Sequence, residues 1–246
     1  MKNKVIKLIS ISVIFILTVG VGCSKIDETG GSDLVWDYPI KPGTAEWKSL
    51  ASNEEKIAVC QIPENVLKTL TDSELLEVCL NYPLLNDIFV FNIIDHGVDK
   101  LINDFNGIRE LYLRKNKSGV FLAKYSDLID NLSKLNRQAS DYEKVEYGLL
   151  ISAVELLISR PEMQKDLALS DQKSFIQELW RAYKMKTEYT TYFGQLGFQT
   201  NIISRGKIIS IIENNEDVCE FTGFFDVSYA SCVDEKTKEI LNVASV

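Results

Sequence analysis

The sequence predicts an all-α fold, an irregular array of antiparallel helical hairpins. Two capping boxes indicate helix starts, Thr71 with Glu74 and Ser140 with Glu143. Apolar residues then recur at helical intervals. Three of the five prolines follow such apolar segments and mark helix ends, because the residue before a proline avoids the helical region. These prolines are Pro63, Pro83 and Pro161.

Residues 44–70 are predicted to form two helices. Thr44 is expected to cap a helix that runs to Cys60, with apolar residues spaced along it. Pro63 ends this helix and suits the first turn of a short helix over 64–70. This segment therefore predicts a helical hairpin with a proline at its turn.

The helix that begins at Thr71 is expected to bury a stripe of leucines. Leu70 before the cap and Leu75 after it are placed for a hydrophobic staple. Further along the chain, the helices are expected to break at Asn106-Gly107, because glycine suits a left-handed C-terminal cap.

The helix that begins at Ser140 is predicted to be the central helix of the core. Its apolar residues cover more than one face, which is typical of a helix surrounded by others. Residues 198–212 have two interpretations. Their spacing favours an isoleucine-rich helix, whereas the strand propensity of isoleucine allows a hairpin that turns at Arg205-Gly206.

The first residues have the features of a secretory signal peptide. Three lysines precede an apolar run, Leu8–Val21, that is too short to span a membrane. Gly20-Val21-Gly22-Cys23 resembles a lipobox, the bacterial signal after which the cysteine becomes the first mature residue and is acylated. Leucine is preferred where Gly20 stands, so ordinary cleavage after Gly22 without a lipid is the alternative. Lipid attachment at Cys23 is the prediction.

These features define the expected domain organisation. Residues after Cys23 are rich in Gly, Ser, Asp and Pro, as in a flexible tether. The last residues are expected to hold a short strand near Phe224 and a helix over 235–243, packed on the helical domain or appended to it. The predicted divisions are a signal peptide (1–22), a tether (23–43), an all-α domain (44–214) and a C-terminal extension (215–246).

The charge of the chain excludes some classes of partner. The net charge is −8, and it becomes −11 once the three lysines of the signal peptide are removed. An acidic body without a basic stripe argues against binding nucleic acid or an anionic membrane surface. The acidic residues are scattered along helical patterns, which favours a solvated surface over an acidic binding face.

Motifs for catalysis or cofactor binding are missing from the sequence. There is one histidine, His96, and no CxxC or HxxxH spacing, so we expect no zinc site. No glycine-rich phosphate-binding motif occurs, so we expect no nucleotide or other cofactor. His96 is the only histidine available as a base for a cysteine or serine nucleophile, but it lies at a predicted helix start, where a surface position is common. No pair of carboxylates is singled out for glycoside hydrolysis.

Four cysteines remain besides Cys23. Cys60 and Cys79 are favoured as buried core thiols over a disulfide, because free cysteine packs as a small hydrophobe. For Cys219 and Cys232 a disulfide and free thiols are equally supported, since an exported protein occupies a compartment that permits disulfides. A reactive thiol is disfavoured because no basic neighbour in sequence would lower a thiol pKa.

A set of residues in the first half forms a pattern. Its members are Cys60-Gln61-Ile62-Pro63-Glu64, Leu67, Leu70, Thr71, Glu74-Leu75, Asn81-Tyr82-Pro83, Phe105-Asn106-Gly107 and Glu110-Leu111. This pattern resembles a family of uncharacterised exported helical proteins, mostly lipoproteins, of Bacteroidota and some Firmicutes. The resemblance is closest over 46–125 and extends more loosely to 214. It implies an exported helical module and no established activity. Some longer relatives carry a Cys-His-x-Tyr-Ala-Trp segment that this chain lacks, so nothing is carried over from it.

The expected function is binding rather than catalysis. The sequence predicts a lipoprotein of the cell envelope, held in the outer membrane and facing the periplasm or the cell surface. Its body is expected to recognise a peptide, a protein or a glycan. The alternatives are an exported hydrolase, with dispersed carboxylates or a Cys/His pair, and a regulatory partner of an exported enzyme.

Overall fold

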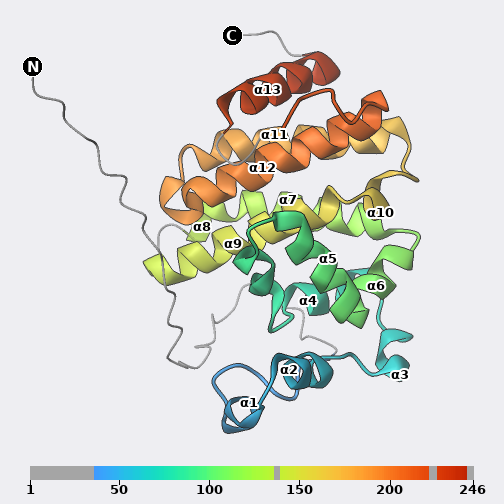
Figure 1. Cartoon of the computed structure of the whole chain (residues 1–246), viewed down its shortest axis with the longest axis vertical. Coiled ribbons are helices and arrows are strands. Elements are labelled where there is room, and N and C mark those ends of the chain that lie inside the picture. The colour runs from blue at the N-terminus through green and yellow to red at the C-terminus, as the bar shows by residue number, and fades with distance from the viewer. Residues whose placement is uncertain (1–35, 136–138, 222–225, 243–246) are drawn as a thin grey trace, which may run out of the picture.

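The computed structural model of the protein describes residues 36–135, 139–221 and 226–242. Over these ranges the chain forms α-helices and one 3₁₀-helix, with no β-strand, so the all-α prediction is confirmed (Figure 1). The elements are α1 (Ala45–Ser49), α2 (Asn53–Val59), α3 (Glu64–Leu67), α4 (Asp72–Leu80), η1 (Leu85–Val90), α5 (Ile94–Asp104), α6 (Asn106–Leu113), α7 (Lys117–Asp130), α8 (Leu132–Leu135), α9 (Asp141–Ile158), α10 (Pro161–Gln164), α11 (Leu169–Lys186), α12 (Thr190–Glu213) and α13 (Val227–Leu241).

Both predicted capping boxes are present. The Thr71 hydroxyl accepts from the Glu74 backbone N–H at 3.3 Å, and the Thr71 N–H donates to the Glu74 carboxylate at 2.8 Å. Ser140 and Glu143 repeat this arrangement at the start of α9. Each box satisfies backbone donors that a helix start otherwise leaves unpaired, which fixes where α4 and α9 begin.

The helix predicted to run from Thr44 to Cys60 is instead two helices, α1 and α2. The Ser52 hydroxyl accepts from the Glu55 N–H at 3.2 Å, and the Ala51 N–H donates to the Glu55 carboxylate at 2.6 Å. Ser52 therefore acts as an N-cap, whose extended backbone breaks the helix before α2 starts.

The predicted break at Asn106-Gly107 lies one residue earlier. Phe105, with φ −115° and ψ 117°, is the extended residue between α5 and α6, and Gly107 is inside α6 rather than a left-handed cap. Gly107 is required for a different reason. A Cβ at this position would lie 2.5 Å from the Phe105 ring and 2.9 Å from Ile62 Cδ1.

Several residues of the pattern found in the first half of the sequence meet around this break. The Asn106 side chain accepts from the Ile62 N–H at 3.0 Å and donates to the Ile62 carbonyl at 2.7 Å, while the Asn106 N–H donates to Gln61 Oε1 at 3.2 Å. The Tyr82 and Phe105 rings stack with their centroids 4.0 Å apart. The pattern therefore joins the segment after α2 to the start of α6, which is a packing role.

The ordered body begins before Thr44, so the predicted extent of the tether needs correction. Tyr38, placed in the tether by the sequence, is buried and donates its hydroxyl to the Val78 carbonyl at 2.9 Å. Trp36 packs edge-on against Tyr38. The predicted signal peptide, Cys23 and the rest of the tether up to residue 35 lie outside the described residues.

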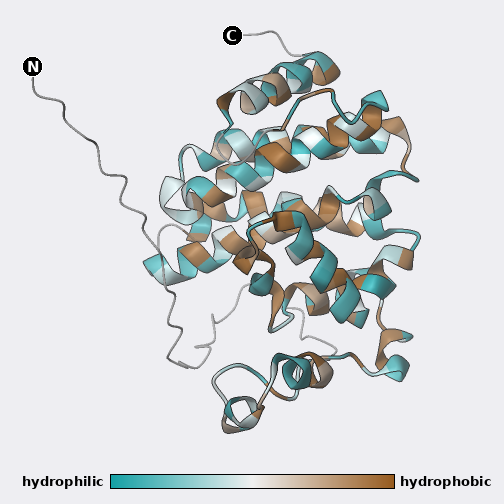
Figure 2. Cartoon of the chain, in the orientation of Figure 1, coloured by the Kyte–Doolittle hydropathy of each residue, from teal (hydrophilic) through white to brown (hydrophobic). Residues whose placement is uncertain are grey.

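The hydrophobic core extends through the described chain from Tyr38 to Val233. In its second half α12 packs on α9 and α11, and α7 covers α9 and α11. Every residue of α9 from Ile151 to Ile158 is buried, which places this helix at the centre as predicted. In Figure 2, hydrophobic residues run along the helices in the middle of the molecule. Residues 198–212 lie within α12, so the helical interpretation is confirmed and the hairpin is excluded.

In the C-terminal extension, residues 215–221 form turns and bends, and a helix follows them. The helix α13 begins after Asp226, whose side chain accepts from the Ser228 and Tyr229 N–H groups, earlier than the predicted start at 235. It packs against α11 and α12 (Figure 1). The strand predicted near Phe224 falls outside the described residues.

The contact between α9 and α12 can be tested at Gly148. A Cβ there would lie 2.0 Å from the Tyr192 carbonyl oxygen, a backbone atom that cannot move aside alone. Helix propensity by itself would make Gly→Ala stabilising by about 1 kcal/mol. We expect Gly148→Ala to be destabilising by about 1–3 kcal/mol through overpacking.

Urea unfolding followed by circular dichroism measures this difference. The control is Gly119→Ala on α7, where an added Cβ would meet only the Asn116 side chain. The predicted packing is wrong if both substitutions raise stability.

Candidate functional site

A fully buried carboxylate, Glu155, lies at the centre of the core. Donors from three other helices converge on it. Tyr125 of α7 donates at 2.6 Å, Thr200 of α12 at 2.8 Å and Asn201 of α12 at 2.9 Å, and Lys186 of α11 lies 2.7 Å away. One side chain of α9 is therefore hydrogen-bonded to α7, α11 and α12.

Lys186, the last residue of α11, is also fully buried. Its ammonium contacts the Glu155 carboxylate, donates to the Gly197 carbonyl at 2.6 Å and lies 4.7 Å from the Phe193 ring centroid. Burial lowers the pKa of Lys186, and the charge of Glu155 opposes this effect. Because neither side chain is exposed, we interpret this ion pair as a structural contact.

Arg205 carries the polar contacts from α12 to α13. Its Nε donates to Asn201 Oδ1 at 3.0 Å and its Nη1 donates to the Thr237 hydroxyl at 3.1 Å. Nη1 also lies 2.8 Å from a carboxylate oxygen of Asp234. Burial lowers the pKa of Arg205, and Asp234 opposes this shift. Nη2 has no hydrogen-bond partner in the part of the chain that the structure describes.

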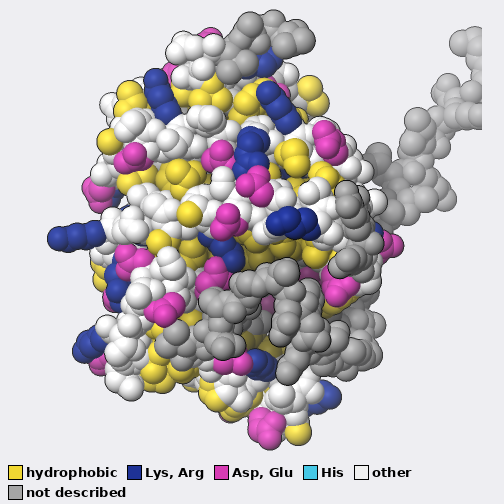
Figure 3. All heavy atoms as spheres, turned by 180° about the vertical axis from the view of Figure 1, so that it is seen from behind, with side chains coloured by type: hydrophobic (Ala, Val, Ile, Leu, Met, Phe, Trp, Pro, Cys, Tyr) yellow, Lys and Arg dark blue, Asp and Glu magenta, His cyan; other side chains and the backbone are white. Residues whose placement is uncertain are grey.

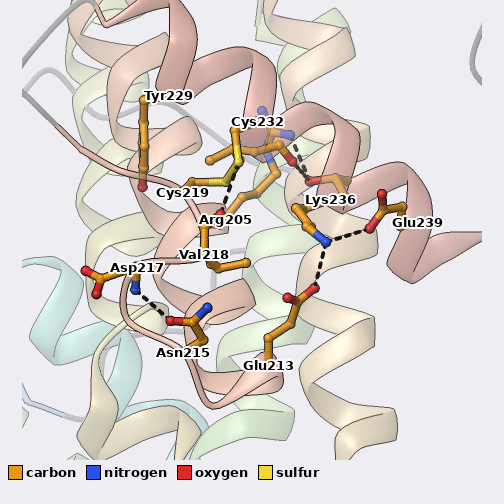
Figure 4. Close-up of a disulfide and its surroundings, with 12 residues drawn as sticks. Arg205, Glu213, Asn215, Asp217, Val218, Cys219, Tyr229, Cys232, Lys236 and Glu239 are labelled. Carbon is orange, nitrogen blue, oxygen red and sulfur yellow. Dashed lines mark hydrogen bonds and ion pairs between the residues drawn. A yellow bond between two sulfur atoms is a disulfide. The ribbon is translucent and has the colours of Figure 1, made fainter.

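A disulfide, Cys219–Cys232, links the segment after α12 to α13 (Figure 4). The bond settles the choice between a disulfide and two free thiols, which the sequence left open for these cysteines. The same figure shows Lys236 of α13 directed at Glu213 and Glu239. By the chain-entropy account, closing a loop of this size stabilises the fold by about 3 kcal/mol, so the disulfide favours the docked position of α13.

Cys60 and Cys79 are free and fully buried, as predicted for core thiols. Burial raises the pKa of Cys60 to about 11, and it raises the pKa of Cys79 as well. His96, in contrast, is exposed in the first turn of α5. An exposed imidazole and a fully buried thiol do not line one open site, so the structure does not bring the Cys/His pair together.

Groups of His, Cys, Asp and Glu that could hold a metal ion were not found among the described residues. None of the described helices is long and apolar enough to cross a membrane. The face shown in Figure 3 carries hydrophobic side chains among charges of both signs, without an extended patch of one sign.

An open groove of about 550 Å³ runs beside α11. Its wall includes the partly buried Trp180 and, from the last turn of α13, Leu241. Arg181 is held at the groove by Glu178 at 2.7 Å and by Asp130 of α7 at 2.6 Å. The lining residues, called the α11 groove from here on, are Gln177, Glu178, Trp180, Arg181, Lys184, Met185, Glu188 and Leu241. A second cleft, beside η1 and α5, has room for about 20 Å³, roughly one water molecule.

Sequence reasoning missed the residues that organise this region. Glu155 lies between Val154 and Leu156 in an apolar run, and Arg205 lies within an isoleucine-rich run. A charge inside a pattern predicted to be buried is a usable signal, because such a charge needs a partner. Trp180 gave no comparable signal, since an aromatic residue at helical spacing also suits the core.

Comparison of the chain with protein-family models, curated proteins and solved structures gave no match.

The buried ion pair gives a testable prediction. Lys186→Met removes the positive partner of Glu155 and leaves a buried carboxylate without an opposite charge. We expect destabilisation of about 3–5 kcal/mol, and we expect Lys186→Met with Glu155→Gln to recover part of it. Chemical unfolding of both variants measures the two values.

Lys68→Met is the matched control, since Lys68 forms an exposed pair with Glu64 and its loss is expected to change stability little. Equal effects of Lys186→Met and Lys68→Met would contradict the structural role of the buried pair.

Proposed function

We propose that the protein is an exported lipoprotein, anchored through Cys23 in the outer membrane of a bacterial cell envelope, whose helical body binds a partner in the α11 groove. The observation that carries this proposal is the groove itself. Its volume of about 550 Å³ falls in the range of about 300–1,000 Å³ that is typical of ligand sites.

The lining of the groove suits binding. Met185 and Leu241 provide apolar surface, Trp180 an aromatic ring, and Gln177 an amide that can donate and accept. Large apolar and aromatic surfaces with a few polar groups are the usual composition of a binding site.

The groove also lies on a rigid support. Lys186 fixes the end of α11 in the core, and Arg181 ties the same helix to Asp130 of α7. A site that is ordered before binding loses less conformational entropy when a ligand arrives. The Glu155–Lys186 ion pair is sealed from solvent and does not line the groove, which favours binding over catalysis by these groups.

The sequence supports the location. Lys2, Lys4 and Lys7, the apolar run and the lipobox-like Gly20–Cys23 are typical of a lipoprotein precursor. The resemblance to exported lipoproteins agrees with this assignment. A lipid together with a tether would leave the groove free to meet a partner at the membrane surface.

The anchor is tested by Cys23→Ala in the full-length protein. We expect the wild type to remain with the membrane fraction after a carbonate wash and the variant to be released, because the variant has no acylation site. Cys60→Ala, which leaves Cys23 in place, is the control. Retention of Cys23→Ala on washed membranes would show that the lipid does not anchor the protein.

The groove is tested by site-specific photo-cross-linking in intact cells. A photo-reactive amino acid replaces Gln177, which lines the groove, or Gln195, which is exposed on α12 and outside it. We expect a discrete adduct from position 177 that is lost when Trp180→Ala is added, and none from position 195. Adducts that form equally at both positions, or at neither, would refute binding in the groove.

A further inference from the structure

Three fully buried side chains from three helices form one hydrogen-bonded group in the core. They are Glu155 of α9, Lys186 of α11 and Asn201 of α12. Glu155 Oε1 lies 2.7 Å from the Lys186 Nζ and accepts from the Asn201 Nδ2 at 2.9 Å. The amine and the amide therefore contact the same carboxylate oxygen. An amine, an amide and a proton carrier in contact are the groups needed to form an amide bond between two side chains.

Lys186 is placed to act as the nucleophile. Burial lowers the pKa of Lys186, although the Glu155 charge opposes this effect, and a lower pKa favours the uncharged amine that can attack a carbonyl carbon. Glu155 is within hydrogen-bond distance of Nζ and can take up the proton. A neutral amine beside a neutral carboxylic acid also avoids the cost of keeping two charges away from water.

The Asn201 amide is oriented and polarised as the electrophile. Its Nδ2 donates to Glu155 and, at 2.9 Å, to the Leu179 carbonyl. Its Oδ1 accepts from the Arg205 Nε at 3.0 Å. A flipped amide would turn its oxygen toward two acceptors, so these contacts fix one orientation. The Arg205 guanidinium stabilises the negative charge that develops on Oδ1 when the amide carbon is attacked.

We propose that Lys186 and Asn201 become joined by an isopeptide bond, with Glu155 as the proton carrier. Nζ attacks the Asn201 amide carbon, the bond from this carbon to Nδ2 breaks, and its electron pair leaves with ammonia. Of the three protons on the Lys186 ammonium, one stays in the new amide, one passes through Glu155 to Nδ2, and one stays on Glu155. One amide replaces another, so no oxidant, reductant or outside substrate is consumed.

The reaction is favoured by its surroundings. It converts the buried ammonium into an amide and leaves Glu155 neutral, which removes two charges from the core. The Lys186 Nζ must move from Oε1 to the amide carbon next to it, and the flexible lysine stem allows this displacement. The ion pair described above is the state before the reaction.

The bond joins α11 to α12 inside the core. None of the three side chains lines the α11 groove, so this inference does not depend on the proposed function. A covalent link between these helices limits their local opening, which is the step that exposes a folded chain to proteases.

Mass spectrometry of tryptic peptides from the denatured full-length protein tests the bond. Trypsin does not cleave after a lysine whose Nζ is in an amide, and no lysine or arginine lies between Lys186 and Arg205. We expect peptide 185–205, with Lys186 uncleaved and with a mass lower by one ammonia molecule, as the main product. Without the bond, the product is peptide 187–205 at its unchanged mass.

A matched pair of substitutions on α9 tests the proton carrier. Glu155→Gln keeps the size of the side chain but cannot take up the proton, and we expect it to lower the linked fraction at least tenfold. Glu146→Gln changes an exposed glutamate of the same helix and should give the linked peptide like the wild type. Circular dichroism shows whether each variant is folded, and the wild-type digest tests the bond without any variant.

The other outcomes overturn the inference. Peptide 187–205 at its unchanged mass as the main wild-type product would show that no bond forms. The same peptide lighter by one ammonia molecule would show a cyclic imide at Asn201, which leaves Lys186 cleavable. Equal linked fractions in folded Glu155→Gln and the wild type would exclude Glu155 as the proton carrier. Cross-linking from position 177 tests the groove separately, so either proposal can fail without the other.

Discussion

The fold depends most on the hydrogen bonds and the ion pair made by the buried Glu155 carboxylate. A buried charge is costly unless it is paired and its remaining lone pairs accept hydrogen bonds. Tyr125, Thr200 and Asn201 supply those hydrogen bonds, and Lys186 supplies the opposite charge. The four partners come from α7, α11 and α12. The polar groups of these helices therefore all find their partners in one arrangement of the helices around α9. Slippage of one helix along another would leave a charge or a polar group unpaired in the core.

The same polar contacts reach the surface. Asn201 connects Glu155 to Arg205, and Arg205 connects α12 to Asp234 and Thr237 of α13. The disulfide between Cys219 and Cys232 then limits how far α13 can leave this position. One wall of the α11 groove is the end of α13 and another is α11. The shape of the groove therefore follows from polar contacts in the core as well as from the residues that line it.

The first half of the chain is organised differently. There the Asn106 side chain forms two hydrogen bonds with the backbone of Ile62, and the Tyr82 and Phe105 rings stack on each other. Several residues of the sequence pattern from the first half belong to this cluster, among them Ile62, Phe105 and Asn106. Their contacts are packing contacts between helices. The candidate binding groove lies in the second half of the chain.

The sequence by itself determined the helical class, both capping boxes and the central position of α9, and it favoured a helix over a hairpin for residues 198–212. These features depend on contacts within about four residues or on the period of apolar residues, which are visible along one chain. The break at Ser52 had the same local signal in Glu55 and could have been predicted. Tertiary structure alone decided the burial of Tyr38, the disulfide between Cys219 and Cys232, and the pairing of Glu155 with Lys186. Each joins residues distant in sequence, and only the packed helices bring such residues within bonding distance.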